Sequence, residues 1–157
     1  MKYIAATFLL FWSIDSWSCS CFRIASIAET IAREPVLIEG QVVSREQVTS
    51  KEYGTQVDSV TLKVIKKLKG VVSSESVTVE GSMCYASLYP ELMKVGHSYV
   101  LPLSEPINNG PHQLAGCAHS GMELISNKLY TFEQAKGIKR RLQLYKSYSE
   151  FLSELKK

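Results

Sequence analysis

After Trp12 the sequence has no apolar run long enough to cross a bilayer, so we expect no membrane span in the released chain. Its net charge is only +3, and the charges are scattered, which argues against a nucleic-acid-binding protein. There is no Asn-x-Ser/Thr sequon, internal repeat or low-complexity tract. These absences favour an ordinary small globular domain.

Sequence motifs of common enzyme classes are also absent. The chain has no Gly-x-Ser-x-Gly, no His-Glu-x-x-His and no phosphate-binding loop. His97, His112 and His119 lie in or beside predicted strands and turns, with no paired carboxylate or activated serine nearby in the sequence. We therefore expect ordinary surface or packing histidines, no enzymatic activity and no cofactor.

What the chain does contain begins with a secretion signal. Lys2 precedes an apolar run over residues 4–12, and Ser16 and Ser18 are the small residues that signal peptidase requires. We predict cleavage after Ser18, which removes residues 1–18 and exposes the α-amine of Cys19. The protein would then be secreted and extracellular, or periplasmic in a Gram-negative bacterium.

Residues 19–157 are enough for one domain with a real core. Lys2 and Asp15 cancel each other, so cleavage leaves the net charge unchanged. A lipid anchor on Cys19 is an alternative, although Ser16 and Trp17 fit the pattern before lipidated cysteines poorly.

Four cysteines follow the cleavage site: Cys19, Cys21, Cys84 and Cys117. An even number in a secreted chain indicates two disulfides. A Cys19–Cys21 bond would close a strained ring, and the other two pairings remain open. Each would close a large loop, worth about 4 kcal/mol in the chain-entropy model. In the simplest interpretation these bonds only stabilise the fold; zinc binding by thiols and a redox pair are disfavoured, because secretion favours oxidation.

Hydrophobic periodicity predicts a mainly β protein with flanking helices. One helix covers residues 24–33 and ends before Pro35, and Gly40 marks a bulge or a bend in the first strand. An exposed connection covers residues 44–55. The predicted strands cover residues 36–43, 57–68, 77–79, 97–103 and 113–117.

The final segment has a helical pattern. Thr131 and Gln134 fit a capping box, and an apolar stripe follows at Ile138, Leu142, Tyr145, Leu152 and Leu155. We therefore predict a long C-terminal helix. Five short strands at this spacing favour a small closed or partly closed barrel.

Several of these features together resemble the netrin-like family, and within it the N-terminal domain of tissue inhibitors of metalloproteinases. The matching residues are Cys19-Ser20-Cys21, the strand over residues 60–70 with its Lys69-Gly70 end, residues 82–88 around Cys84, and residues 114–117 before a helix. Their order and separations agree over nearly all of residues 19–157.

The resemblance implies an OB-fold-like five-stranded β-barrel with a short N-terminal helix and a long C-terminal helix. It also implies the disulfides Cys19–Cys84 and Cys21–Cys117. In the family's inhibitors, two segments form a ridge that enters a protease cleft. The matching positions here are Cys19, Ser20, Cys21 and Phe22 in one segment, and Met83, Cys84, Tyr85 and Ala86 in the other.

The resemblance further implies a zinc-capping chemistry. A catalytic zinc keeps one coordination position open, which the backbone amine and carbonyl of Cys19 could fill as a bidentate pair. An α-amine with a pKa near 7.7–8.0 is partly neutral at pH 7, so its lone pair is available. Ser20 would point toward the pocket for the substrate side chain beyond the scissile bond. The expected partner is a zinc metalloprotease.

A second hypothesis belongs to a different functional class. The chain lacks the inhibitors' third disulfide, and Phe22 and Arg23 make the ridge bulkier and charged. It could instead be a netrin-like module that binds an extracellular protein or an acidic polysaccharide without a metal. The basic residues of 136–141 are expected to be the solvated face of a helix or a polyanion-binding patch. We expect a monomer under either hypothesis.

Overall fold

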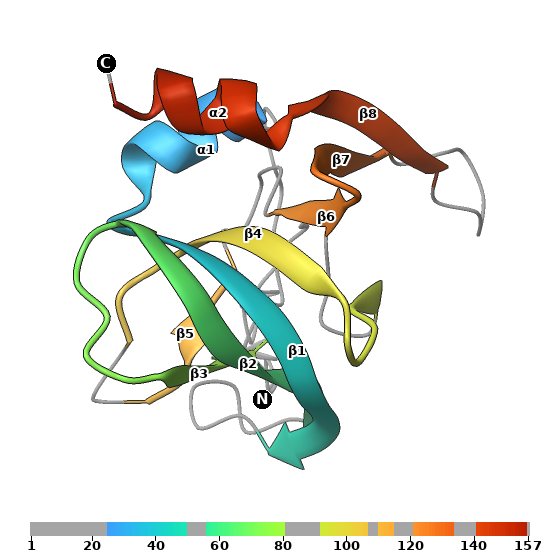
Figure 1. Cartoon of the computed structure of the whole chain (residues 1–157). Coiled ribbons are helices and arrows are strands. Elements are labelled where there is room, and N and C mark those ends of the chain that lie inside the picture. The colour runs from blue at the N-terminus through green and yellow to red at the C-terminus, as the bar shows by residue number, and fades with distance from the viewer. Residues whose placement is uncertain are drawn as a thin grey trace, which may run out of the picture.

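The computed structural model describes residues 25–49, 56–80, 92–106, 110–114, 121–133 and 141–156. Within these ranges the chain forms one eight-stranded sheet and two short helices (Figure 1). The predicted class, mainly β with flanking helices, is confirmed. The elements in chain order are α1 (Ile27–Arg33), β1 (Val36–Thr49), β2 (Gln56–Lys69), β3 (Ser76–Glu80), β4 (Ser98–Leu103), β5 (His112–Gln113), β6 (Met122–Ile125), β7 (Lys128–Glu133), β8 (Arg141–Ser147) and α2 (Tyr148–Glu154).

β1 and β2 form a long antiparallel hairpin in which buried and more exposed side chains alternate. In β2, Val60 and Leu62 are fully buried, whereas Thr61 is half-buried and Lys63 is exposed, as their alternation predicts. The pairing shifts register just before Gly40, so the bulge expected there is confirmed. A Cβ at this glycine would lie 3.1 Å from Leu62 Cδ2, a tight contact that would require the Leu62 side chain to move by a few tenths of an ångström.

The first strand is longer than its sequence predicts. We expected it to end at Val43, but β1 continues to Thr49, which pairs with Gln56. The side chains of residues 43–47 are all exposed. The prediction of a loop from residue 44 is wrong because the backbone pairing of an exposed hairpin requires no buried face, and so leaves no alternation to detect.

The sheet curls so that the two ends of the set β1 to β5 come into contact. The sheet order places them as β5-β3-β2-β1-β4, with β5 parallel to β3. Leu114, directly after β5, forms an antiparallel bridge to Leu103 at the end of β4. The backbone N–H of Ser104 also donates to the carbonyl of Gln113 at 3.2 Å. The strands at the two ends of this set therefore meet each other.

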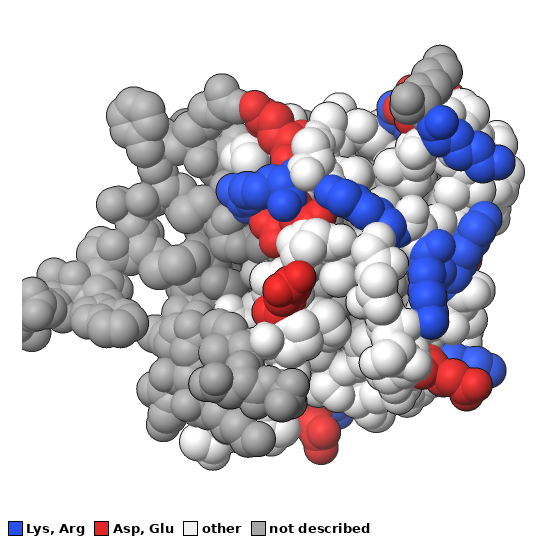
Figure 2. All heavy atoms as spheres, turned by 90° about the vertical axis from the view of Figure 1, so that its left-hand side faces the viewer, with Lys and Arg blue, Asp and Glu red and all other residues white. Residues whose placement is uncertain are grey.

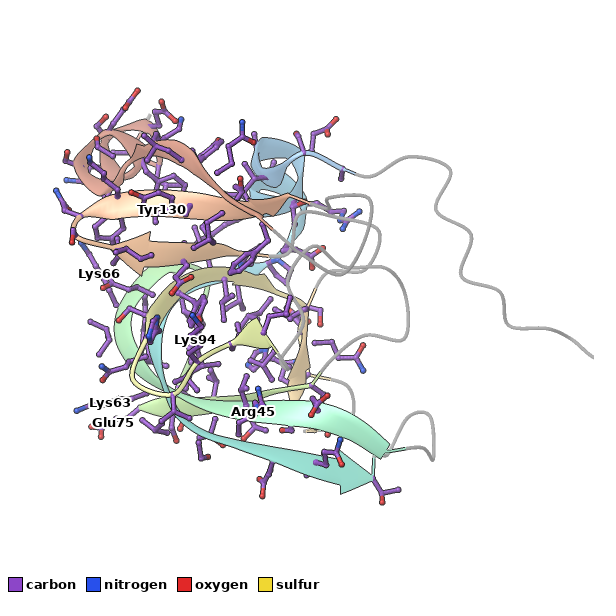
Figure 3. The ribbon with its side chains drawn as sticks, turned by 90° about the vertical axis from the view of Figure 1, so that its right-hand side faces the viewer. Arg45, Lys63, Lys66, Glu75, Lys94 and Tyr130 are labelled. Atoms are coloured by element: carbon purple, nitrogen blue, oxygen red, sulfur yellow. The ribbon has the colours of Figure 1, made fainter. Side chains whose placement is uncertain are left out.

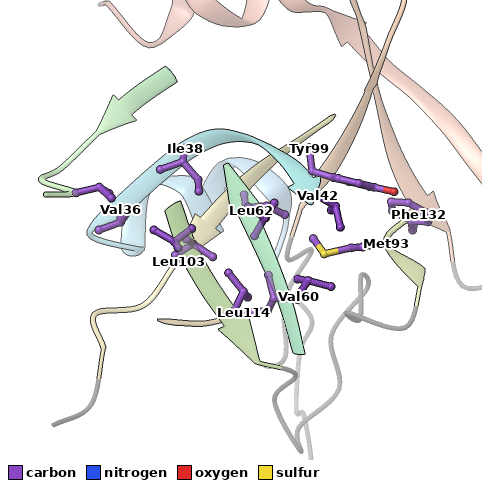
Figure 4. Packing of buried hydrophobic residues seen from close by; sticks show 14 residues of the cluster. Val36, Ile38, Val42, Val60, Leu62, Met93, Tyr99, Leu103, Leu114 and Phe132 are labelled. Carbon is purple, nitrogen blue, oxygen red and sulfur yellow. The ribbon is translucent and has the colours of Figure 1, made fainter. Parts of the chain in front are cut away.

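A first hydrophobic cluster fills the inside of these strands and is here called the ring core (Figure 4). Its buried members are Val36, Ile38, Val42, Val60, Leu62, Val72, Val77, Val79, Met93, Tyr99, Leu101, Leu103, Leu114 and Phe132. The four predicted strands at residues 36–43, 57–68, 77–79 and 97–103 all contribute. Their apolar side chains converge because the strands curl around a common interior.

A second cluster, here called the helix core, lies on the opposite face of β1 and β4. It joins Ile27, Leu37, Val100, Met122, Leu129 and Phe151. Neighbouring residues such as Leu37 and Ile38 are both fully buried, because one belongs to each core. This two-sided burial explains the continuous apolar runs at residues 36–38 and 99–101.

Helix α1 is fixed at both ends. Ser26 caps its N-terminus in a reciprocal capping box with Glu29. At the other end, Lys69 Nζ donates to the carbonyls of Ile31, Ala32 and Glu34 at 2.8, 2.9 and 2.8 Å. A lysine there satisfies the last carbonyls and complements the helix dipole. The end of β2 therefore holds α1 in place.

The next residue makes this junction tight. Gly70 has φ +75°, and an added Cβ would lie 2.2 Å from the carbonyl oxygen of Pro35. The chain after α1 and the end of β2 approach so closely that only glycine fits.

Three strands beyond β5 were not among the five predicted. β6, β7 and β8 extend the sheet from β4, so the described part of the sheet has eight strands rather than five. β6 and β7 form a hairpin through Ser126 and Asn127, which have φ 47° and 61°. Two positive φ values are typical of a type I′ turn.

The prediction of a long C-terminal helix from Thr131 is wrong. Thr131 lies in β7 and pairs with Gln143 of β8, and its hydroxyl donates to the Gln143 carbonyl at 3.4 Å. The helix α2 begins only at Tyr148, after the N-cap Ser147. Leu152 of this helix and Leu155, the residue that follows it, pack against the helix core.

The apolar stripe at helical spacing was therefore misleading over residues 141–147. Leu142 and Leu144 also fit the period of a strand, and pairing with β7 selects that alternative.

Candidate functional site

The residues predicted for the inhibitory ridge lie outside the described part of the chain. These are Cys19, Ser20, Cys21, Phe22, Met83, Cys84, Tyr85 and Ala86. Cys117 and residues 136–140 also lie outside it. The predicted disulfides, the ridge and the basic patch therefore stay predictions.

The described residues contain a groove along β3, here called the β3 groove. Its volume is about 720 Å³. It is lined by Glu46, Val48, Thr49, Ser59, Val71, Val72, Ser73, Ser74, Ser76, Val77, Thr78, Glu80, Pro106, Gly110, Pro111 and His112. The groove thus lies between the end of β1, the β2–β3 connection and the segment before β5.

Polar side chains cross the sheet in one row at this groove. Glu46 of β1 pairs with Ser59 of β2, Ser59 pairs with Glu80 of β3, and Glu80 pairs with Gln113 of β5. Directly paired residues project from the same face of a sheet. The neighbouring pair Val60 and Val79 enters the ring core, so the polar row occupies the opposite face.

Two members of this row are buried without partners. Ser59 is 1% exposed, and its hydroxyl has no hydrogen-bond partner. Glu80 is 7% exposed, and its carboxylate makes no hydrogen bond or ion pair among the described residues. Buried polar groups are nearly always satisfied, so unsatisfied ones at a groove indicate where a ligand group would bind.

His112 also lines the groove, but it pairs with Val79, which enters the ring core, and so it does not belong to the polar row. Its Nδ1 lies 2.7 Å from the carbonyl oxygen of Ser104, and a carbonyl only accepts, so Nδ1 carries a proton. In the neutral ring Nε2 is then an acceptor. Among the described residues that line the groove, the titratable side chains are Glu46, Glu80 and His112, and none is Lys or Arg.

A lysine of β2 lies at the other end of β3. Lys63 pairs with Ser76 and stands beside Glu75 (Figure 3). Ser76 and Glu80 are four positions apart on an extended strand, which is about 13 Å. Lys63 therefore does not neutralise the floor of the groove at Ser59 and Glu80.

A second carboxylate, Glu123 of β6, is used differently. It is 3% exposed and accepts a hydrogen bond from His97 Nδ1 at 2.5 Å. Tyr99, which pairs with Glu123 across the sheet, is buried, and its hydroxyl accepts from the Lys94 N–H at 3.0 Å. Burial raises the pKa of Tyr99, the Lys94 hydrogen bond opposes this, and the Glu123 charge adds to the increase.

His97 thus has a carboxylate partner, although none lies near it in the sequence. His97 and Glu123 are far apart in the sequence, and only the pairing of β4 with β6 brings them together. The contact joins two strands of the sheet, and the β3 groove does not include it.

The described residues show neither a metal cluster nor a membrane-spanning helix. Within the described ranges, no group of three or more His, Cys, Asp or Glu side chains could hold a metal ion. Neither of the helices α1 and α2 is long and apolar enough to cross a membrane. No protein-family model matches the chain, and no curated protein matches it.

Proposed function

We propose that this chain is a secreted netrin-like binding module that holds an extended segment of another extracellular protein in the β3 groove. The observation that carries the proposal is the position of the groove. The order β5-β3-β2-β1-β4, with the return contact from Leu114 to Leu103, supports an OB-type barrel built from β1 to β5. OB-type barrels bind ligands on the face of their second and third strands, between the loops that follow the first and fourth. The β3 groove lies on the corresponding face.

The size and lining of the groove favour a peptide segment. A volume of about 720 Å³ is within the range of small-ligand sites and would hold a few residues. Serine and threonine hydroxyls at residues 73, 74, 76 and 78 can exchange hydrogen bonds with a peptide backbone. Valines and prolines of the lining can contact its apolar side chains.

The charges disfavour the acidic polysaccharide that the sequence left as an option at this site. The part of the lining that the structure describes carries two carboxylates and no lysine or arginine. Figure 2 shows Lys and Arg interspersed with Asp and Glu over the face that it presents, without one merged basic surface. A polyanion gains most from a continuous basic surface.

Selection of displayed peptides tests the proposal. Random heptapeptides would be selected on the secreted, oxidised protein and then tested against Thr78→Trp, in which a bulky side chain fills the groove. Gln143→Trp, on exposed β8, is the matched control. We expect the selected peptides to lose binding to Thr78→Trp by about tenfold or more and to keep it with Gln143→Trp. Peptides that bind all three proteins equally would refute use of the groove.

A second candidate function is capping of a protease zinc by the amine and carbonyl of Cys19. The observation that favours it is the fixed position of α1, which starts shortly after the predicted ridge. The Ser26 capping box and the three hydrogen bonds of Lys69 hold this helix on the end of β2. A segment anchored in this way loses less entropy on binding.

The N-terminus decides this second candidate. N-terminal sequencing should find Cys19 as the first residue with an unmodified amine. One added Ala before Cys19 should then abolish inhibition of any metalloprotease that the unextended protein inhibits. Equal inhibition by both forms, or none by either, would remove the zinc-capping hypothesis and leave the groove untouched.

A further inference from the structure

We infer that the floor of the β3 groove, at Ser59 and Glu80, receives an arginine side chain of the partner segment. The inference rests on the proposed function and specifies the chemistry that the groove recognises. It depends on the two buried and unpartnered polar groups of the groove.

The two groups are direct neighbours. Ser59 and Glu80 are paired across the antiparallel β2 and β3 and project from the same face. The Cβ atoms of such a pair lie about 4.5–5.5 Å apart. One planar group of a ligand can therefore contact the hydroxyl and the carboxylate together.

The position of Glu80 favours a cation. A carboxylate with little exposed surface is stabilised by a ligand that brings an opposite charge or hydrogen bonds. Glu80 is 7% exposed and has no such partner among the described residues. Glu46, at the end of the same row, adds a second negative charge, and the described residues that line the groove include no lysine or arginine.

The floor requires a hydrogen-bond donor as well as a charge. The unpartnered Ser59 hydroxyl can accept a hydrogen bond. A guanidinium carries five N–H donors, has no acceptor, and binds a carboxylate through two parallel hydrogen bonds. It could pair with Glu80 and still donate to Ser59.

Lysine and metal ions fit this arrangement less well. An ammonium group is a point charge without the planar fork, so it does not match the cross-strand pair. A metal ion needs several ligands, and the described residues provide no cluster of three metal-ligating side chains here.

Selected peptides provide the probe. Random displayed heptapeptides would be selected in parallel on the wild-type protein, on Glu80→Gln and on Glu75→Gln. Glu75 lies before β3 and does not line the groove, so its variant is the matched control. We expect one position of the wild-type and Glu75→Gln peptides to be enriched in arginine, and the Glu80→Gln peptides to lose this enrichment.

The strongest wild-type peptide would then be synthesised with arginine, lysine or citrulline at the enriched position. Citrulline keeps the shape of arginine without its charge. We expect the citrulline peptide to bind wild-type protein at least about tenfold more weakly than the arginine peptide does. The affinity of the lysine peptide should lie between those of the arginine and citrulline peptides. Ser59→Ala should weaken the arginine peptide severalfold and leave the citrulline peptide nearly unchanged.

The comparison of peptides on wild-type protein needs no variant to fold. Thermal unfolding would check that each substituted protein is folded before its result is used. Peptides that Thr78→Trp displaces but that show no arginine enrichment would overturn this inference and leave the proposed function standing. Equal binding of arginine and citrulline peptides would also overturn it. Failure to select any groove-dependent peptide would overturn the proposed function as well.

Discussion

The β3 side of the sheet and the side that carries the helices treat buried polar groups differently. On the β3 side, Ser59 and Glu80 are buried without partners. On the helix side, Glu123 receives a hydrogen bond from His97, and Tyr148 of α2 donates its hydroxyl to Glu39 of β1. Partnered groups of this kind hold elements together, whereas unpartnered ones raise the energy of the empty site. The difference indicates that Glu123 should be tested for a structural role and Glu80 for a role in binding.

Gly70→Ala should reduce stability the most, because Gly70 lies where the chain after α1 meets the end of β2. The added Cβ would meet the carbonyl oxygen of Pro35 at 2.2 Å, and φ +75° is unfavourable for alanine. We expect the free energy of unfolding to fall by about 3 kcal/mol or more, measured by urea denaturation.

Gly96→Ala is the matched control for this substitution. Gly96 also has a positive φ, +85°, but an added Cβ there would have nothing within 4 Å. Its cost should be about 1 kcal/mol, from the backbone conformation alone. Equal losses for the two variants would show that the close approach at Gly70 does not matter.

Lys69→Met should have the next largest effect. The substitution keeps an apolar stem and removes the hydrogen bonds to the carbonyls of Ile31, Ala32 and Glu34. We expect a loss of about 2 kcal/mol and faster hydrogen exchange in α1 than in β2. Lys67→Met, on the same strand and exposed, should change stability by less than about 0.5 kcal/mol.

The two buried carboxylates provide the most direct test of the comparison. Glu123→Gln replaces a charge-assisted hydrogen bond with a neutral one and should cost about 1–2 kcal/mol. Glu80→Gln removes a buried charge that has no partner and should be neutral or slightly stabilising. Chemical denaturation at pH 7 would measure both. A larger loss for Glu80→Gln than for Glu123→Gln would reverse the assigned roles.

Tyr148→Phe should have the smallest effect, about 1 kcal/mol near neutral pH, because it removes the hydrogen bond to Glu39. Burial, then the hydrogen bond and charge of Glu39, raise the pKa of Tyr148 above its ordinary value of 10.0. Since the folded state favours the protonated hydroxyl, the contribution is complete below pH 10 and is lost as the pH rises above it.

The stability of the wild-type protein should therefore approach that of Tyr148→Phe as the pH is raised from 9 to 12. Tyr99 ionises in both proteins, so it cancels in the difference. A difference that stays constant over this range would contradict the assigned contact between α2 and β1.

The sequence predicted the ring region better than the helix region. Strands at residues 57–68, 77–79 and 97–103 alternate strongly or run continuously apolar, because their side chains enter the ring core. The helix region was harder to predict, since the apolar pattern around Leu142 and Leu144 fits both the helical period and the strand period over a short stretch. Pairing with β7, a long-range contact, selected the strand there.

The groove could have been only partly anticipated. The outward positions of β3, Ser76, Thr78 and Glu80, alternate visibly with its valines, which marks a polar face. No local signal indicates that Glu80 is buried, that Ser59 lies opposite it, or that the segment before β5 closes the other side. Those facts depend on strand register and on a parallel contact between distant segments.

The sequence by itself determined the β class, the four strongest strands and the end of α1 before Pro35, because each is encoded in local periodicity and in the restriction that a proline imposes. Only the tertiary structure decided which polar residues became satisfied and which stayed unpaired. The Glu123–His97 contact and the Ser59–Glu80 pair both require strand pairing across long stretches of chain. Side-chain burial is a property of the assembled sheet, so no local pattern can specify it.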